Sequence, residues 1–363
     1  MTVASAADRR QQVVWKGPPR LDLRYEVTHR PTQSMWEAMM KVTPGMASSG
    51  EDPIVRELED YVAELTGKEA AMYLPTTTNG TVLACMARDV RGKQVIMEAR
   101  CHIYWVERLH ISHLAGAAPK LIRGDKYGAM DLQAIEDAIN ETAYGYTPPT
   151  GMICLENTHN VYGGTVLTPA YTEAVAKLAH DHGIDLFLDG ARVFNSAVAL
   201  DVPVRALTAP ADHLVLSLNK GLGAPLGGVL CGSREFVDEA KVLAKRMGMI
   251  AIHKAGLFAA AGMVALKTMY AGLADDHRRA RRLAEGLSEI DGLSLDLETV
   301  QTNLVRVSTA GTGISALELA HRVAEHGLAI HVMEPDVFKM ALCYDVDDAQ
   351  VDEALAIFAK VLA

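Results

Sequence analysis

The sequence predicts an α/β protein whose large domain holds a mostly parallel sheet and whose C-terminal part forms a small α+β domain. Short apolar runs alternate with amphipathic stretches from about residue 50 to 255. These runs are continuous rather than alternating, which is typical of strands covered by helices on both faces. Near residue 256 the pattern changes to long helices mixed with short strands, which predicts a second domain.

Five apolar runs are expected to be strands of the large domain, over 50–255: EAAMYL, KQVIMEA, GMICLEN, IDLFLDG and HLVLSLNKG. A helix is expected to follow the first run, from about Asn79. The stretch TPAYTEAVAKLAHDHG has the signals of a complete helix. Thr168 suits the N-cap, Pro169 the first helical position and Gly183 the position just past the end.

The small domain is expected over 256–363. Two long helices are indicated by GLFAAAGMVALKTMYAGL and DDHRRARRLAEGLSEI, and a closing helix by DDAQVDEALAIFAKVL. Short strands are expected at TNLVRVS, LAIHVM and VFKMALCY. Residues 1–49 precede the large domain, and their polar start is expected to be a mobile arm without a secretory signal.

The composition argues against several function classes. The chain has 363 residues, 49% of them hydrophobic, and a formal net charge of −10, whereas a nucleic-acid surface needs a basic face. No uninterrupted run approaches about 18 apolar residues, so we expect no membrane span. The five scattered cysteines form no C-x-x-C pair, which predicts reduced thiols in a cytoplasmic protein and no metal site.

Polar side chains follow the expected strands, where ligands bind in an open parallel sheet. One ligand class would use them together: a pyridine aldehyde phosphate, which needs an amine, an anion facing the ring nitrogen, amide donors for the phosphate and a flat partner for the ring. The residues concerned are Thr76, Thr77, Thr78, His102, Asn157, His159, Asp189, Arg192 and Lys220.

Asp189 and Lys220 carry this hypothesis as a pair. Asp189 ends an apolar strand, where a carboxylate needs a partner such as a pyridinium N–H. Lys220 lies about 30 residues later, in LSLNKGLGAPLGG, after the next strand, and this spacing fits one strand–connection–strand unit. Taken singly, Asp189 is more often an N-cap or a salt-bridge partner of Arg192, and Lys220 a solvated charge.

The other residues allow structural alternatives too. The threonines of LPTTTNGT begin a helix whose free N–H groups favour an anion, but similar helix caps are common and no nucleotide-binding loop is present. A single histidine is more often a satisfied polar residue than a catalyst. Two histidines, His102 and His159, at the same sheet edge as Lys220 favour the functional interpretation.

Three stretches closely resemble the L-threonine aldolase family of fold-type-I pyridoxal-phosphate enzymes: ENTHNVYGGTVLTPAY, FLDGARVFNSAVAL and LNKGLGAPLGGVLCG. RPTQSMWEAM, GEDPIVRELEDYVAELTGKEAAMYLP and LFAAAGMVAL extend the similarity over about residues 20–350. The resemblance implies the aspartate-aminotransferase-like fold, with a mostly parallel seven-stranded sheet. It also implies a homodimer or homotetramer with sites shared between subunits, to which residues 1–49 contribute.

The resemblance implies a role for each matching position. Lys220 would bind pyridoxal 5'-phosphate covalently, Asp189 would pair with its ring nitrogen, and His102 would stack on the ring. Arg192 would contact the cofactor's phenolic oxygen or the substrate carboxylate, and His159 would reach the substrate's β-hydroxyl. Thr77 and Thr78 stand where the family holds the phosphate, and Asn157 falls in the matching ENTH stretch of the cofactor site.

The substrate positions depart from the family pattern. Tyr25 replaces a substrate-contacting serine, Ser49 a tyrosine and Asn219 a serine. Lys339 and His253 replace two arginines, of which the first clamps the substrate carboxylate. An ammonium lacks the planar fork of a guanidinium, so this change is not conservative, and Arg306 is a candidate replacement clamp.

The resemblance thus implies a lyase that cleaves the Cα–Cβ bond of a β-hydroxy-α-amino acid and releases glycine and an aldehyde. The altered substrate shell leaves β-elimination, transaldolation or racemisation as alternatives with the same cofactor. A non-catalytic homologue would be expected to lack Lys220 or Asp189, and both are present.

Overall fold

The computed structural model describes residues 13, 15, 17–107, 109–141, 147–250 and 253–363. The described residues form two compact units. The large unit comprises Arg30–Val161 and Thr165–Ala271, and the small unit comprises the described residues up to His29, Tyr162–Gly164 and Gly272–Ala363. Most of the expected mobile arm lies outside the described residues.

This division differs from the expected domain boundaries at both ends of the large domain. The C-terminal boundary lies after Ala271 rather than near residue 255, because α10 (Ala255–Val264) packs on α1 (Gln33–Lys41) and α2 (Pro53–Thr66) of the large unit. The stretch before residue 50 is divided, since α1 belongs to the large unit and the residues before Arg30 to the small unit.

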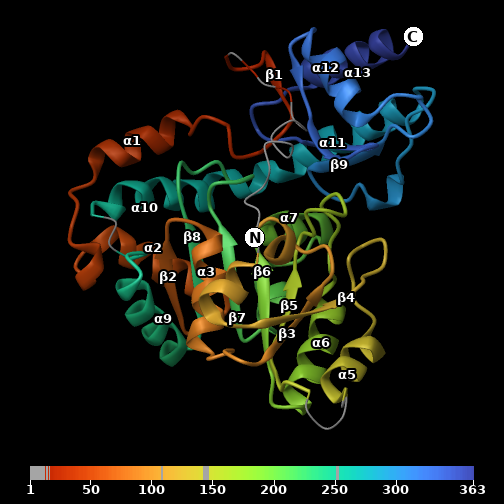
Figure 1. Cartoon of the computed structure of the whole chain (residues 1–363). Coiled ribbons are helices and arrows are strands. Elements are labelled where there is room, and N and C mark those ends of the chain that lie inside the picture. The colour runs from red at the N-terminus through yellow and green to blue at the C-terminus, as the bar shows by residue number, and fades with distance from the viewer. Residues whose placement is uncertain (1–12, 14, 16, 108, 142–146, 251–252) are drawn as a thin grey trace. The chain divides into compact units, whose positions relative to one another are not determined.

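The large unit is built on a seven-stranded sheet in the order β2-β8-β7-β6-β5-β3-β4 (Figure 1). Its strands are β2 (Ala70–Leu74), β3 (Gln94–Glu98), β4 (Ala118–Ile122), β5 (Thr150–Glu156), β6 (Asp185–Gly190), β7 (His213–Ser217) and β8 (Gly228–Gly232). Strand β8 runs antiparallel to both of its neighbours, β2 and β7, and the other pairings in this sheet are parallel. The mostly parallel seven-stranded sheet is confirmed.

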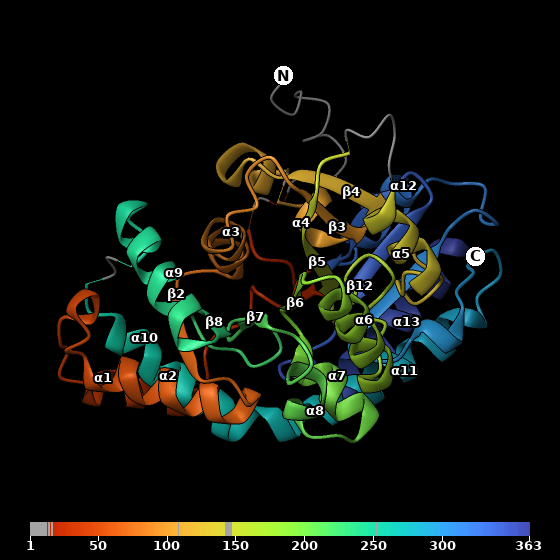
Figure 2. The same ribbon diagram turned by 90° about the horizontal axis from the view of Figure 1, so that it is seen from below.

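Helices cover both faces of this sheet. In the view from below, α3 lies on one side of the strands and α2, α7 and α8 on the other (Figure 2). The remaining α-helices of the large unit are α3 (Thr77–Ala87), α4 (His102–Trp105), α5 (Leu132–Asn140), α6 (Pro169–Asp181), α7 (Val193–Leu200), α8 (Val204–Thr208) and α9 (Arg234–Arg246). It also has the 3-10 helix η2 (Ala47–Ser49) and the π-helices η3 (Ile111–Ala115) and η4 (Ala265–Met269), and the 3-10 helix η5 (Tyr270–Gly272) spans the unit boundary.

Local sequence signals explain where these helices begin and end. The Thr168 side chain accepts a hydrogen bond from the Tyr171 N–H at the start of α6, and Gly183 after its end has φ +67°. Both were expected. Helix α3 begins at Thr77 instead of the expected Asn79, because the Thr76 hydroxyl caps it by accepting from the Asn79 N–H.

The core on one face of the sheet consists of strand side chains packed against α3 and α9. Met72, Val215 and Leu230 are completely buried there, with Leu83 of α3 and Val237 of α9. A fully buried aliphatic side chain contributes about 1.5–3 kcal/mol. These contacts fix the strands of the sheet against α3 and α9.

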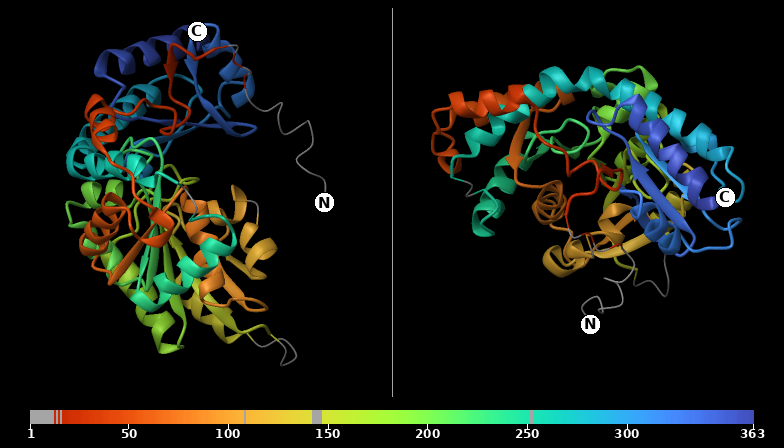
Figure 3. Two further views of the ribbon diagram at one scale, coloured as in Figure 1. Left: turned by 90° about the vertical axis from the view of Figure 1, so that its left-hand side faces the viewer. Right: turned by 90° about the horizontal axis from the view of Figure 1, so that it is seen from above.

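The small unit contains a three-stranded antiparallel sheet, β11-β12-β9, and a two-stranded parallel pair, β1-β10 (Figure 3). Its elements are β1 (Leu21–Asp22), α11 (Leu273–Ser288), η6 (Leu297–Thr299), β9 (Leu304–Ser308), α12 (Ala316–Ala324), β10 (Leu328–Ala329), β11 (His331–Glu334), β12 (Val337–Ala341) and α13 (Asp348–Leu362). The expected mixture of helices and short strands is therefore present.

One helical run among the described residues, Ala255–Ser288, is long and apolar enough to cross a membrane by length and composition. Of its apolar window, 44% is buried inside the protein. A core helix passes the same test, so the run is weak evidence for a membrane span.

Candidate active site

Three buried carboxylates lie side by side at the carboxyl ends of neighbouring strands. They are Glu98 on β3, Glu156 on β5 and Asp189 on β6, and the last two are Cα partners in the sheet register. Buried charges of one sign need cations or hydrogen-bond donors beside them. The residues around these carboxylates are therefore expected to be donors or cations.

Asp189 is the least compensated of the three. It is 3% exposed, its carboxylate accepts one hydrogen bond, from the Ala191 N–H at 3.2 Å, and it makes no ion pair with any described residue. The alternative of a salt bridge with Arg192 is therefore not what the structure has. Burial, then the charge of Glu156, raises the pKa of Asp189 to about 6, whereas the charges of His102 and Lys220 lower it.

Lys220 lies in the turn that follows β7, in the same unit as Asp189. Its carbonyl accepts from the Gly223 N–H at 2.8 Å, and Gly223 has φ +74°, a conformation that glycine adopts without strain. Leu218 N–H donates to the Gly227 carbonyl at 2.9 Å and closes the loop. The glycines thus fix the backbone that carries the lysine.

Glu107 connects two of the predicted site residues. One oxygen, Oε1, accepts from the Thr78 hydroxyl at 3.0 Å and contacts His102 Nδ1 at 3.2 Å. The other oxygen, Oε2, lies 3.1 Å from Nε2 of His110. The Glu107 side chain is only 3% exposed, whereas that of His102 is 23% exposed. This carboxylate therefore orients the imidazole that remains accessible.

The N-terminus of α3 has the close backbone approach expected of an anion site. A Cβ added at Gly228 would lie 2.9 Å from the Thr77 nitrogen, so only glycine fits where β8 passes the start of the helix. Thr77 is the first residue of α3, and Thr78 follows with its hydroxyl on Glu107. The N–H groups and dipole of the helix favour an anion here.

His159 forms a buried pair with Glu98. Its Nε2 lies 3.0 Å from Glu98 and 3.8 Å from Glu156, and the residue has no exposed surface. Burial alone would lower the pKa of His159, but the charges of Glu156 and Glu98 and the hydrogen bond to Glu98 raise it. Glu98 is itself fixed by the N–H groups of Arg100 and Gly124.

Asn157 and Arg192 are buried beside the strand ends. Asn157 donates to the Leu167 carbonyl at 2.9 Å, and its Oδ1 accepts from the Ser196 hydroxyl and the Leu167 N–H. These bonds hold the loop after β5 closed, and the expected cofactor contact of Asn157 stays a prediction. Arg192, 9% exposed, precedes α7 in the same unit as Asp189.

The sequence is similar to those of known proteins. Residues 22–310 match the model of the Beta-eliminating lyase family. Low-specificity L-threonine aldolase 1 of Arabidopsis thaliana is 37% identical over 345 residues, 94% of this chain and 96% of that protein. A low specificity L-threonine aldolase of Escherichia coli O157:H7 is 34% identical over 82% of this chain and 87% of its own length.

The chain belongs to the threonine aldolases of the beta-eliminating lyase family. Solved structures agree in fold. A threonine aldolase of Leishmania major superposes with a TM-score of 0.80 at 18% identity, covering 94% of this chain and 100% of that one. A putative L-allo-threonine aldolase of Listeria monocytogenes gives a TM-score of 0.78 at 20% identity, with coverages of 94% and 96%. The fold-type-I class is confirmed.

The remaining predicted site residues of this threonine aldolase family member lie in the small unit. Lys339 on β12 has Arg306 of β9 and His331 of β11 as its cross-strand partners, so the three side chains share one face. Lys339 is 6% exposed, and Arg306 contacts Glu334 at 3.4 Å. The Tyr25 hydroxyl lies 3.0 Å from His331 Nδ1. Tyr25, Arg306 and Lys339 therefore gather in one region of that unit.

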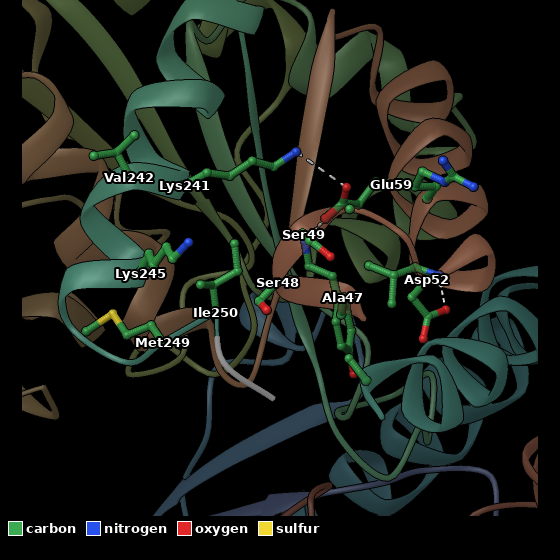
Figure 4. Close-up of a pocket in the computed structure, with 15 residues that line it drawn as sticks. Ala47, Ser48, Ser49, Asp52, Glu59, Lys241, Val242, Lys245, Met249 and Ile250 are labelled. Atoms are coloured by element: carbon green, nitrogen blue, oxygen red, sulfur yellow. Dashed lines mark hydrogen bonds and ion pairs between the residues drawn. The ribbon is translucent and has the colours of Figure 1, made fainter. Parts of the chain in front are cut away.

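The other departures from the family pattern lie elsewhere in the large unit. Ser49 lines a pocket of about 330 Å³ between η2, α2 and α9, in which Lys241 contacts Glu59 at 3.5 Å (Figure 4). Lys220, Asp189 and His102 do not line this pocket. His253 is exposed, and Asn219 accepts from the Ser217 hydroxyl at 2.8 Å.

Sequence reasoning missed the acidic residues of the site. Glu98 and Glu156 end apolar strands just as Asp189 does, so the strand-end rule that selected Asp189 also finds them. Glu107 carries no such signal, because it lies five residues after His102 beyond a short helix.

Proposed function

We propose that this protein is a pyridoxal-phosphate-dependent lyase that cleaves the Cα–Cβ bond of a β-hydroxy-α-amino acid to glycine and an aldehyde. One observation carries the proposal: among the described residues the buried carboxylate of Asp189 forms no ion pair, and it lies at the end of the strand beside the one that leads to Lys220. The relatives named threonine aldolases support the same reaction.

The residues present fit the cofactor. The buried Asp189 carboxylate accepts one backbone hydrogen bond, so a ring N–H could pair with it, and Gly228 leaves the α3 N-terminus open where a Cβ would crowd it. Lys220 would hold the aldehyde carbon, Thr77 and Thr78 the phosphate, and His102 one ring face. When bound, pyridoxal phosphate supplies an electron sink for the pair of electrons left at Cα.

Asp189 would keep the ring nitrogen protonated, because a cation beside this carboxylate lowers the pKa of Asp189, which burial otherwise raises. Glu107 holds His102 in one orientation through Nδ1. Asp189 would thus position the nitrogen edge of the cofactor ring, and Glu107, through His102, one face of it.

His159 is the proposed acceptor of the β-hydroxyl proton. The raised pKa makes the ring a stronger base than an ordinary histidine, and Glu98 at 3.0 Å stabilises the imidazolium that forms. The ring has no exposed surface. Because Nε2 faces Glu98, we propose that the β-hydroxyl proton reaches the other ring nitrogen, Nδ1, directly or through one water.

The substrate carboxylate has three candidate partners: Arg192 in the large unit, and Arg306 and Lys339 in the small unit. The substrate contact of Tyr25, in the small unit, stays a prediction from the sequence. Because Lys339 replaces a clamping arginine, a different reaction with the same cofactor, β-elimination, transaldolation or racemisation, is the second candidate function. Sites shared between subunits of a dimer or tetramer, and a cytoplasmic location, stay predictions from the sequence.

A product screen tests the proposal. The purified protein with added pyridoxal phosphate is incubated with a panel of β-hydroxy-α-amino acids, and glycine, aldehyde, ammonia and substrate chirality are measured together. We expect equal amounts of glycine and aldehyde from at least one substrate. Lys220→Arg should abolish this, whereas Lys177→Arg, at an exposed position of α6, should not. Ammonia with a keto acid, or racemised substrate without glycine, would replace the aldolase proposal with the second candidate.

A further inference from the structure

A cluster of three different metal-ligating side chains lies in the small unit. His29, Cys343 and Asp345 offer a nitrogen, a sulfur and a carboxylate oxygen, all within 4.8 Å of one another. His29 Nδ1 lies 2.5 Å from Asp345 Oδ2, and Cys343 Sγ lies 3.3 Å from Asp345 Oδ1. None of these residues belongs to the proposed lyase site.

We infer that His29, Cys343 and Asp345 form a binding site for a divalent transition-metal ion of the zinc class. Imidazole, thiolate and carboxylate are the donors that Zn²⁺ takes, at about 2.0–2.3 Å each. Tetrahedral donors at such bond lengths lie about 3.3–3.8 Å apart. The sulfur–oxygen separation already matches, and the nitrogen–oxygen contact has to open by about 1 Å.

The second ring nitrogen of His29 has the partner that metal-binding histidines use. Nε2 lies 3.1 Å from the Tyr25 carbonyl oxygen, which can only accept, so Nε2 carries the proton. In the neutral ring, this leaves the Nδ1 lone pair directed at the other two ligands. An N–H donated to a backbone carbonyl fixes the tautomer and the orientation of a ligating histidine.

Burial separates the roles of the three ligands. Cys343 has no exposed surface and the His29 side chain is 6% exposed, whereas the Asp345 side chain is 44% exposed. Asp345 therefore faces the solvent from which an ion would enter, and it has room to move as the nitrogen–oxygen contact opens. Three protein ligands leave a fourth position, which water fills.

A further carboxylate adds negative potential beside the sulfur. Glu26 is 2% exposed and accepts from the Asn303 amide, and the same amide nitrogen donates to the carbonyl of Leu342, the residue before Cys343. Binding of a divalent cation offsets this charge. The thiol proton, and any proton held between His29 and Asp345, pass to the solvent on binding.

Cobalt(II) is the probe that tests the inference, because its thiolate charge-transfer and visible ligand-field absorption report the donor set. The pyridoxal-phosphate-loaded full chain, freed of metal by chelation, is titrated with Co²⁺ and then with Zn²⁺. We expect one Co²⁺ per chain with thiolate absorption, displaced by Zn²⁺. Asp345→Asn, at an exposed position, and Cys343→Ser should each weaken binding about tenfold or more.

Two controls keep the result specific. Asp291→Asn changes another exposed carboxylate of the small unit, and Cys231→Ser another fully buried thiol in the large unit. Both should bind Co²⁺ as the unchanged protein does. Absence of thiolate-bound Co²⁺ in the unchanged protein, or binding that survives both ligand variants, would overturn the inference and leave a hydrogen-bonded His29–Asp345 ion pair. Because Co²⁺ binding is measured without turnover, its result does not depend on the lyase proposal.

Discussion

Glu107→Gln is expected to weaken the cofactor site without unfolding the protein. The amide keeps an oxygen where Oε1 accepts from Thr78 and His102, and it removes the charge. The new NH₂ group faces His110, which lies 3.1 Å from Oε2. Burial lowers the pKa of His110, and a neutral ring can accept this hydrogen bond. Folding should therefore be retained.

The size of the effect follows from the two bonds to one buried oxygen. A hydrogen bond to a charged group contributes about 1.5–3 kcal/mol and a neutral one about 0.5–1.5 kcal/mol, so each bond loses about 1 kcal/mol. Two such losses, about 2 kcal/mol, correspond to about thirtyfold. Since the Glu107 side chain is 3% exposed, solvent does not screen this difference.

The Thr78 contribution should appear as weaker cofactor binding and the His102 contribution as lower kcat. The assay is titration of the cofactor-free protein with pyridoxal phosphate, followed by steady-state kinetics at saturating cofactor. Glu173→Gln, an exposed glutamate on α6, is the matched control and should change neither quantity. A Glu107→Gln enzyme with unchanged cofactor affinity and unchanged kcat would refute the role given to this carboxylate.

Three further predictions concern Asp189, Gly228 and Lys339. Asp189→Asn should leave the protein folded but nearly inactive. Because the pKa of Asp189 in the folded protein is raised from 3.8 to about 6, the cofactor-free wild type should lose stability relative to this variant as the pH rises through about 6. Denaturation of both proteins at pH 4 and pH 8 measures this change. An equal difference in unfolding free energy between the two proteins at both pH values would contradict the assignment. Gly228→Ala should lower the unfolding free energy by about 1–3 kcal/mol and weaken cofactor binding, because the new Cβ would meet the α3 N-terminus. Thermal unfolding and titration with pyridoxal phosphate measure the two effects. Gly272→Ala, at a position with open space around it, is the control and should change neither quantity. Lys339→Arg should lower KM for L-threonine or L-allo-threonine about tenfold if this position binds the substrate carboxylate, and unchanged kinetics would move that role to Arg192 or Arg306.

The sequence predicted the sheet well where its strands are buried. Strands β3, β5, β6 and β7 are covered on both faces, so each is a continuous apolar run. Strand β4, APKLI, was not predicted because it is partly exposed, whereas β2 at the other edge of the sheet is buried throughout and was predicted. The antiparallel β8 was hidden in the glycine-rich stretch after Lys220.

The domain boundaries were harder to predict than the elements. The helical run from Ala255 to Ser288 crosses from one unit to the other, and periodicity alone does not show which unit a helix packs on. The pairing of β1 with β10 joins residues about 300 apart, and no local pattern signals it.

For the candidate site, the strand-end rule found Asp189, Lys220 and the two histidines, because it depends only on topology. It did not show that His159 is completely buried against Glu98. The cluster of His29, Cys343 and Asp345 escaped because metal sites are recognised in sequence by short ligand spacings. Here the histidine and the aspartate are 316 residues apart.

The most direct test of the account is to find where the cofactor binds covalently. The protein is purified with pyridoxal phosphate, reduced with borohydride, digested, and its peptides are mapped by mass spectrometry. The account predicts a yellow protein whose reduced cofactor lies on Lys220, in the peptide that contains LSLNKGLGAPLGG. A cofactor fixed on another lysine, or a protein that binds no pyridoxal phosphate, would contradict it.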